Sequence, residues 1–313
     1  MEVPITQSKE WAELQSDLKE KHYYEEGNGY RFLIIVKNTP FGKYLYLPYG
    51  PYVEKDNKVL IARAIRNVRK IARRENAIFI RVEPQMTSFN KDLPYKIVKS
   101  ADLNPAETWI LDLEGTDDDL NKKLPSRLQR YYRNIEKSHI TIETSHNPSD
   151  IKYLLTLQRE FANKKGINTF SEEYLKTELS QPFSTLYLLK YTPPEENKSE
   201  VIAAGLVFDQ NQTRYNLQGA QSEQGRKLHA TGILTIRLIK DAKAKKLKYF
   251  DFWGIAPEDA PDNHPWKGFT NFKKMFDGYE VKYTGTYDIV LKPFKYNIYC
   301  IIRRINRLLR KVQ

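Results

Sequence analysis

The sequence is poor in the residues that form disulfides, metal clusters and membrane spans. Its one cysteine, Cys300, excludes an intramolecular disulfide and is typical of a reducing cytosol. The five histidines show no metal-site spacing, so we expect no metal. No apolar run approaches the ~20 residues of a spanning helix. Residues 1–11 lack the basic and apolar regions of a secretory signal, so we expect a cytoplasmic protein.

Two common phosphate-binding loops are also absent. The sequence contains neither G-x-x-x-x-G-K-[ST] nor G-x-G-x-x-G. A nucleotide held by a loop of either type is therefore excluded.

Positive charge is abundant instead. The chain has 51 lysines and arginines against 39 acidic residues, which gives a net charge of +12 over 313 residues. Such an excess predicts a polyanionic partner: nucleic acid, an anionic membrane or a phosphorylated substrate. The length suits two domains, and a hydrophobic content of 40% is typical of a globular protein.

Two segments concentrate this charge on predicted helices. Residues 59–74 form an amphipathic pattern with an arginine-rich face, which is either solvated or binds an anionic partner. The second segment follows a predicted strand at Trp109–Leu113 and interleaves Tyr131 and Tyr132 with basic residues. These tyrosines either stack on bases or pack against the core. The basic residues singled out for nucleic acid are Arg127, Arg130 and Arg133.

The segment from Tyr249 to Gly278 combines a strand, a proline-rich loop and a short helix. An aromatic strand at Tyr249–Trp253 contains one carboxylate, Asp251, and a loop with three prolines follows. Residues 269–276 predict a helix, and Gly278 predicts a left-handed cap at its end.

The predicted helix of this segment carries one lysine whose role has two interpretations. Phe272 and Phe276 are one turn apart and share a face, so Lys273 points elsewhere. Either Asp251, the loop and Lys273 form a pocket, or the aromatic residues are core and Lys273 pairs with Asp277 at i+4.

Three segments together give the chain a resemblance to a known family. They are Tyr46–Pro51, Trp109–Thr144, and the run Asp251, Gly254 and Ile255 followed by Phe272-Lys273-x-x-Phe276. In order and spacing they resemble the FemX/FemA/FemB (FemAB) family of peptidoglycan-bridge aminoacyltransferases, over most of residues 1–292.

The resemblance implies an α/β (α+β) protein of two GNAT-like (GCN5-related acetyltransferase-like) domains with mixed sheets. Both halves of the chain show the matching element order of helix, strands, central strand, long helix and strand. We expect domain 1, which binds the precursor, to span 1–143 plus 290–313 with a basic C-terminal helix. Domain 2 is expected to span 144–289.

The resemblance also implies a reaction. Aminoacyl-tRNA would donate an amino acid to the stem peptide of a peptidoglycan precursor, either lipid II or UDP-MurNAc-pentapeptide. The donor ester is already activated, so no cofactor is expected. Lys273 is expected to stabilise the oxyanion, and Glu83 and Asp251 to orient the acceptor amine. Tyr215 and Phe272 are expected to contact substrate.

Two alternatives remain beside this interpretation. The first is another GNAT-type N-acyltransferase that uses CoA. The loop Gln221–Ala230 disfavours it, because it has one glycine and an acidic residue, Glu223, where a pyrophosphate would bind. The second is a non-catalytic basic module that binds RNA or membrane. The early Trp11 is followed by Ala12 and Glu13 instead of the family's basic residue, which puts contacts to the precursor diphosphate in doubt.

The tail at 294–313 has its own pattern. Apolar residues recur every three or four positions, six basic residues fill the gaps, and no acid occurs among them. Either this is a terminal helix docked on the first domain, or it is an interfacial membrane helix. Both hold if the apolar face packs on the protein and the arginines face an anionic membrane. We expect a monomer in the cytoplasm, with this tail as a peripheral contact at the inner face of the membrane.

Overall fold

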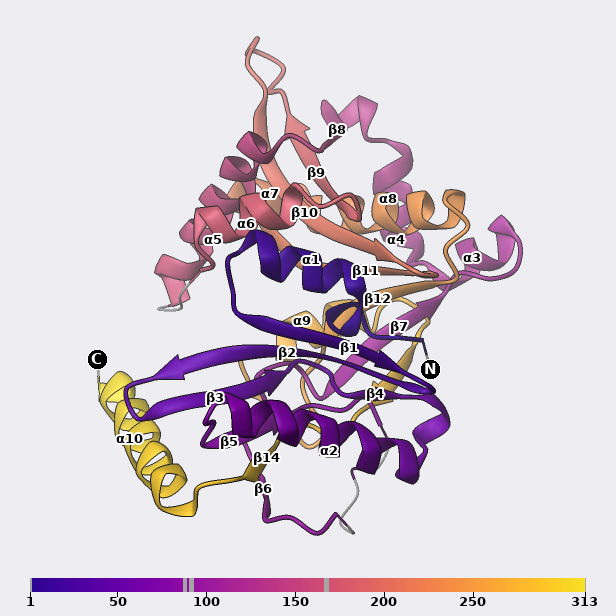
Figure 1. Ribbon diagram of the computed structural model, residues 1–313. Helices are drawn as coiled ribbons and strands as arrows, with labels where there is room; N and C mark the ends of the chain where they lie inside the picture. Colours follow the sequence, from indigo (N-terminus) through magenta and orange to yellow (C-terminus); the bar gives the residue numbers. More distant parts are fainter. Residues whose placement is uncertain (1, 87–88, 90–92, 166–168, 313) are drawn as a thin grey trace. The chain divides into compact units, whose positions relative to one another are not determined.

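The computed structural model describes residues 2–86, 89, 93–165 and 169–312, with the backbone alone at 164–165 and 306–312. The chain divides into two compact units (Figure 1). Unit 1 comprises Met1–Ala106 and Lys282–Gln313, and unit 2 comprises Glu107–Val281. Each unit is built around its own mixed sheet, so the expected α/β fold of two GNAT-like domains is confirmed.

Unit 1 has the strand order β1-β2-β3-β5-β14-β6, with β4 paired to β2. The pairing of β3 with β5 is parallel, and the other described pairings in this sheet are antiparallel. The elements of this unit are η1 (Ile5–Gln7), α1 (Lys9–Asp17), β1 (His22–Gly27), β2 (Tyr30–Thr39), β3 (Gly42–Leu47), β4 (Tyr52–Val53), η2 (Glu54–Asp56), α2 (Lys58–Arg74), β5 (Phe79–Val82), β6 (Ile97–Lys99), β14 (Tyr287–Val290) and α10 (Pro293–Val312).

Helix α2 covers one face of this sheet with the face that its sequence predicts. Asn57 caps its first turn, and Ile61, Ile65 and Val68 are fully buried against the strands. Of its basic residues, Arg63, Arg66, Lys70, Arg73 and Arg74 remain exposed. The amphipathic pattern of this segment is therefore confirmed.

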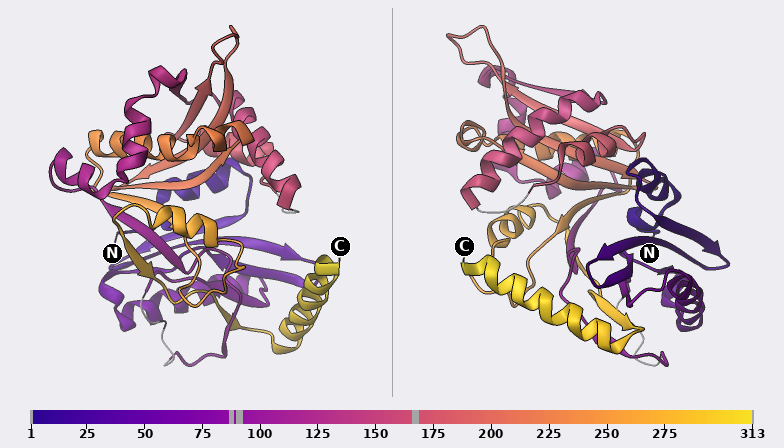
Figure 2. Two further views of the ribbon diagram at one scale, coloured as in Figure 1. Left: turned by 180° about the vertical axis from the view of Figure 1, so that it is seen from behind. Right: turned by 60° about the vertical axis from the view of Figure 1, so that its left-hand side comes forward.

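Unit 2 has the strand order β13-β7-β12-β11-β10-β9-β8, in which β11 and β12 run parallel. Helices α8 and α5 both pack against β10 and β11, and two further views show the sheet with its helices (Figure 2). The elements are β7 (Glu107–Asp112), α3 (Asp117–Lys123), α4 (Ser126–Arg133), η3 (Glu136–Ser138), β8 (Ile140–Ser145), η4 (Pro148–Asp150), α5 (Ile151–Lys165), α6 (Glu172–Leu179), β9 (Ser184–Tyr191), β10 (Glu200–Gln210), β11 (Thr213–Gln221), α7 (Glu223–Lys227), α8 (Ala230–Ala244), β12 (Tyr249–Gly254), α9 (Lys267–Lys273) and β13 (Tyr279–Lys282).

The boundaries of the two units differ from the expected ones. Residues 107–143 lie in unit 2, because β7 pairs with β12 and α4 packs on α8. Residues 282–289 lie in unit 1, because β14 is hydrogen-bonded between β5 and β6. Both shifts depend on strand pairings between segments far apart in sequence, which a linear pattern does not reveal.

The helix expected at residues 269–276 is α9, and it ends earlier, at Lys273. The predicted left-handed cap at Gly278 is wrong, because Gly278 is not among the described glycines with positive φ. A glycine is needed there for a different reason. A Cβ at this position would lie 2.4 Å from the carbonyl oxygen of Ile110, so a side chain would push the chain away from β7.

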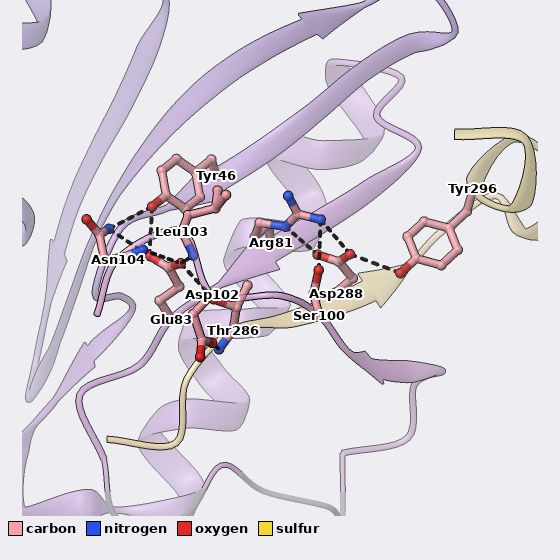
Figure 3. A network of polar contacts seen from close by, with 10 residues as sticks. All are labelled: Tyr46, Arg81, Glu83, Ser100, Asp102, Leu103, Asn104, Thr286, Asp288 and Tyr296. Carbon is pink, nitrogen blue, oxygen red and sulfur yellow. Dashed lines mark hydrogen bonds and ion pairs between the residues drawn. The ribbon is translucent and has the colours of Figure 1, made fainter. Parts of the chain in front are cut away.

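A buried ion pair links β5, β14 and α10 of unit 1 (Figure 3). Arg81 donates from Nε and Nη2 to the two carboxylate oxygens of Asp288, each at 2.8 Å. Tyr296 on α10 donates its hydroxyl to Oδ2 of Asp288 at 2.9 Å, and Arg81 also donates to Ser100. Because the paired charges are almost completely buried, this network fixes which face of α10 packs on the sheet.

Candidate functional site

The end of strand β12 places a carboxylate at the edge of the core of unit 2. Phe250 and Phe252 point into that core, and Asp251 between them is buried on the other face. The pairing of β12 with β11 ends at Asp251, opposite Tyr215. Its pairing with β7 shifts register between Asp251 and Gly254, so a bulge interrupts the strand there.

Trp253 lies at this bulge in a left-handed conformation, with a φ of 64°. Such a φ is rare for an aromatic residue and costs free energy that the surrounding structure must supply. The turn brings the Trp253 N–H back to Oδ1 of Asp251 at 2.7 Å. The local strain therefore positions a hydrogen-bond donor on the carboxylate.

Asp251 receives a second donor from β7. The hydroxyl of Thr108 donates to the same oxygen, Oδ1. Burial raises the pKa of Asp251 to about 6, while these two hydrogen bonds and the charge of Lys273 act in the opposite direction. Among the described residues, both hydrogen bonds to this carboxylate go to Oδ1, which leaves Oδ2 for another group.

Lys273, the last residue of α9, faces this carboxylate. Its Nζ donates to the carbonyl oxygen of Gly254 at 2.5 Å. Burial lowers the pKa of Lys273 to about 8, and the negative charge of Asp251 opposes that shift. In the described part of the chain the partner of this ammonium is Gly254 and not the carboxylate of Asp277. The i+4 pair with Asp277 is therefore not formed, whereas Phe272 and Phe276 do belong to the core, as the same interpretation expected.

Aromatic contacts hold α9 in place. Phe276 is completely buried, and Phe272 packs beside it with ring centroids 5.6 Å apart. Thr270 accepts a hydrogen bond from the N–H of Ala256 at 2.8 Å, which ties the start of the preceding loop to the helix. Lys273 therefore projects from a helix that is anchored on both its aromatic face and its loop.

Tyr215 also lies near the end of β12. It pairs with Asp251 at the end of the parallel pairing of β11 with β12. Its ring lies edge-on to that of Trp253, with the ring centroids 6.1 Å apart. Unit 2 thus places Tyr215, Asp251, Phe272 and Lys273 around one strand end. A cation and an acid with displaced pKa values in an apolar setting are typical of a functional site.

Glu83 belongs to unit 1 and has a different environment (Figure 3). Its Oε1 accepts hydrogen bonds from the N–H groups of Leu103 and Asn104 at 3.1 and 3.2 Å, and from the Thr286 hydroxyl at 2.7 Å. Its Oε2 accepts from the Tyr46 hydroxyl at 2.7 Å and the Asn104 amide at 2.8 Å.

These five donors occupy the acceptor capacity of the Glu83 carboxylate. Burial raises the pKa of Tyr46 well above its usual value, which keeps its hydroxyl a donor. The geometry therefore makes Glu83 the residue that holds the chain at Leu103–Asn104 against β3, in the segment where the sequence predicts precursor binding. A substrate amine would have to displace one of these donors to reach it.

The three arginines singled out on α4 are all exposed. Arg127 donates to the Tyr131 hydroxyl at 2.8 Å and lowers the pKa of that tyrosine. Arg127 and Arg130 also lie over the Tyr131 ring, which stacks on His229 at 4.6 Å. Tyr131 and Tyr132 pack against the core of unit 2, as the second interpretation of these tyrosines predicts. The arginines remain at the surface.

Sequence analysis did not identify several residues that surround Asp251 and Glu83. Thr108 lies 143 positions from Asp251, and Asn104 lies in an irregular segment, so neither carries a local signal. The left-handed Trp253 is not encoded by residue type, since glycine or asparagine is usual there. Burial in β7 does not alternate, since Thr108 and Leu111 are its buried residues, so this strand offered no periodic signal either.

The described residues contain no group of three or more histidine, cysteine, aspartate or glutamate side chains that could hold a metal ion. Among the same residues, no helix combines the length and apolar character required to cross a membrane.

The displaced pKa of Lys273 can be measured directly. We expect reductive ¹³C-methylation and NMR titration to give Lys273 a midpoint near 8, because burial disfavours its charged form. Asp251→Asn should lower that midpoint further, since it removes the negative charge that favours the ammonium. A midpoint near the ordinary 10.5, or one that Asp251→Asn leaves unchanged, would contradict the geometry.

Comparison with known proteins extends this picture. The FemAB family model matches residues 175–304, which include Tyr215, Asp251 and Lys273. No curated protein matches the sequence. The solved structure of FemX is 18% identical, with a TM-score of 0.79 and 94% of each chain covered.

Two other solved structures share the fold at greater distance. L-PGS from Bacillus licheniformis is 14% identical with a TM-score of 0.59, and covers 98% of this chain and 99% of its own. The C-terminal domain of a putative lysylphosphatidylglycerol synthetase from Agrobacterium fabrum is 12% identical with a TM-score of 0.60, at 93% and 90% coverage. At such identities the likeness shows the fold, while the family model adds the sequence pattern. Together they confirm the resemblance seen in the sequence: residues 175–304 match the FemAB family, and the chain shares the fold of FemX.

Proposed function

We propose that this protein is an aminoacyltransferase that moves an amino acid from aminoacyl-tRNA to the stem peptide of a peptidoglycan precursor, lipid II or UDP-MurNAc-pentapeptide. The observation that carries the proposal is the Asp251–Lys273 pair at the end of β12, inside the segment that the FemAB family model matches. The protein would act as a monomer in the cytoplasm and would need no cofactor.

The reaction makes an amide from an ester. A neutral primary amine of the stem peptide attacks the ester carbonyl, and a tetrahedral intermediate with an oxyanion forms. The bond to the ribose oxygen then breaks, the tRNA leaves with a proton on that oxygen, and the amide remains. The two demands on the protein are to accept the proton of the amine and to stabilise the oxyanion.

Lys273 is suited to stabilise the oxyanion. With a pKa of about 8 it is mainly charged at neutral pH, and its partial burial strengthens its field relative to water. Asp251 is suited to accept the proton of the attacking amine. Its pKa of about 6 makes it ionised yet basic enough near neutral pH, and Oδ2 is the oxygen that its described neighbours leave available. Tyr215 and Phe272 would line the same place.

Unit 1 would bind the precursor. The Glu83 network holds Tyr46, Leu103 and Asn104 in a fixed arrangement, so its contribution is to shape the binding surface and not to take a proton. This assigns Glu83 a positioning role in the same reaction.

The exposed arginines of α4 would bind the tRNA. Arg127, Arg130 and Arg133 have no carboxylate partner among the described ion pairs, and Leu128 anchors their helix in the core. Phosphate contacts of this type are independent of sequence and sensitive to salt.

The structure also bears on the competing CoA-dependent reaction. The loop where a CoA pyrophosphate would bind forms the short helix α7. Ser222 accepts from the Gly225 N–H at 3.0 Å, and the Gln221 side chain accepts from the Thr231 N–H at 3.3 Å. Gly225 is also so close to the carbonyl of Ile202 that a Cβ would lie 2.3 Å away. Amides that a pyrophosphate would need are thus already bonded, which favours an aminoacyl-tRNA donor.

The first test changes the proposed oxyanion contact. Purified protein is incubated with mixed aminoacyl-tRNAs and precursor, and the mass of the stem peptide is followed. We expect Lys273→Met to slow single-turnover transfer by about 10²–10³-fold while precursor affinity changes little.

The neighbouring Lys274 gives a matched control, because it is exposed and pairs with Glu280 at 3.3 Å. Lys274→Met should transfer at nearly the normal rate. Equal losses in both variants, or a loss of precursor binding in Lys273→Met without a loss of rate, would remove Lys273 from the proposed role. No mass increase with any donor would refute the transferase itself.

The second test concerns the donor. We expect Arg127→Gln/Arg130→Gln/Arg133→Gln to weaken binding of tRNA and to reduce its salt dependence, because phosphate contacts release counterions. Filter binding over a range of salt concentrations measures both. The matched control is Arg63→Gln/Arg66→Gln/Lys70→Gln on the exposed face of α2. If the control loses binding and the α4 variant keeps it, the tRNA binds on α2.

A further inference from the structure

Helix α10 packs on unit 1 through aromatic side chains. Tyr296 is 6% exposed, and its ring lies 5.2 Å from that of Phe79. Tyr299 lies 4.9 Å from Phe79 and 6.1 Å from Tyr44. The hydroxyl of Tyr296 also bonds to Asp288, which is paired with Arg81, so the rotation of the helix about its axis is set by a buried network (Figure 3).

This rotation turns an apolar stripe away from the protein. Phe294 is 76% exposed, Ile301 59% and Ile305 48%, and their spacing of seven and four residues puts them on one side of the helix. The expectation that the apolar face of the tail packs on the protein is therefore wrong for these residues. Cys300 is also exposed. The physical reason is that the tyrosines bring both ring area and a hydroxyl that satisfies Asp288, which isoleucine cannot do.

The stripe is flanked by positive charge alone. Lys295 and Arg304 are exposed, Arg303 is partly buried, and residues 293–313 contain no acid. The remaining tail positions expected to be apolar or basic, Arg307, Leu308, Leu309, Arg310, Lys311 and Val312, have side chains outside the described residues. The backbone nevertheless continues as a helix to Val312.

Exposed apolar residues flanked by basic residues without acidic neighbours fit one kind of binding partner better than others. A second copy of the helix would bring like charges together, and a nucleic acid would leave Phe294, Ile301 and Ile305 in water. The interface of an anionic membrane takes both features, with apolar side chains below the headgroups and cations among them.

We propose that α10 docks the protein on anionic phospholipid membranes through Phe294, Ile301 and Ile305, with Lys295 and Arg304 contacting the headgroups. Docking does not depend on the transferase activity. If the proposed function holds, docking on the membrane favours the lipid-linked acceptor over the UDP-linked acceptor; this last step rests on that function.

The test measures binding of the full chain to vesicles of phosphatidylglycerol and phosphatidylcholine, against vesicles of phosphatidylcholine alone. We expect binding to the anionic vesicles that weakens as salt rises. Ile301→Ser/Ile305→Ser should weaken it by about tenfold or more, because two aliphatic side chains no longer leave water. Circular dichroism confirms that each variant is folded.

The matched control replaces two exposed apolar residues on other elements, Val59→Ser/Phe170→Ser, which are 69% and 52% exposed. This control should bind as the natural protein does. Because Cys300 is the only cysteine and is exposed on α10, a polarity-sensitive fluorophore attached there gives a second readout. Its emission should shift to the blue with anionic vesicles and not with neutral ones.

Three outcomes would overturn the proposal. One is no binding of the natural protein to anionic vesicles at low salt. Another is equal binding by Ile301→Ser/Ile305→Ser and its control, which would leave attraction by charge alone. The third is a dimer in solution that only Ile301→Ser/Ile305→Ser dissociates, which would make the stripe a contact between copies. Failure of transfer with intact vesicle binding would affect the proposed function and not this inference.

Discussion

The functional arrangement of unit 2 depends on one electrostatic constraint, a carboxylate and an ammonium placed together where water is largely excluded. Burial raises the pKa of Asp251 to about 6 and lowers that of Lys273 to about 8. The charge of each residue partly opposes the shift in the pKa of the other. A pair of this kind is stable only if further hydrogen bonds satisfy it. Thr108, Trp253 and the carbonyl of Gly254 supply them.

Other features of unit 2 follow from that need. The bulge in β12 and the left-handed Trp253 bring an N–H to the carboxylate. Phe272 on α9 and the completely buried Phe276 that follows the helix hold the lysine in position. In unit 1 a second carboxylate, Glu83, has a different environment: five donors saturate it and hold the chain around Leu103 and Asn104 in place.

Local patterns predicted what local physics determines. The buried side of α2 is the one its spacing indicates, and Lys273 points away from Phe272 as helical geometry requires. Order and spacing of the motifs also led to the FemAB resemblance, which the family model matches over residues 175–304, and to the two-domain fold.

Contacts between distant segments could not be predicted in the same way. Thr108 meets Asp251 only because β7 pairs with β12, and the same pairing moves residues 107–143 into unit 2. The tail illustrates a second limit. Its aliphatic and aromatic faces are both apolar, and the choice between them depends on a buried partner, Asp288, that bonds to a tyrosine.

The pH dependence of kcat/KM for aminoacyl transfer tests the central claim most directly, because it reports the pKa values of the free enzyme and requires both the reaction and the pair. The rate should rise as Asp251 ionises near pH 6 and fall as Lys273 loses its proton near pH 8. Asp251→Asn should remove the acid limb from whatever activity remains. A rate that is flat from about pH 6 to pH 8, or an acid limb that persists in Asp251→Asn, would contradict the account.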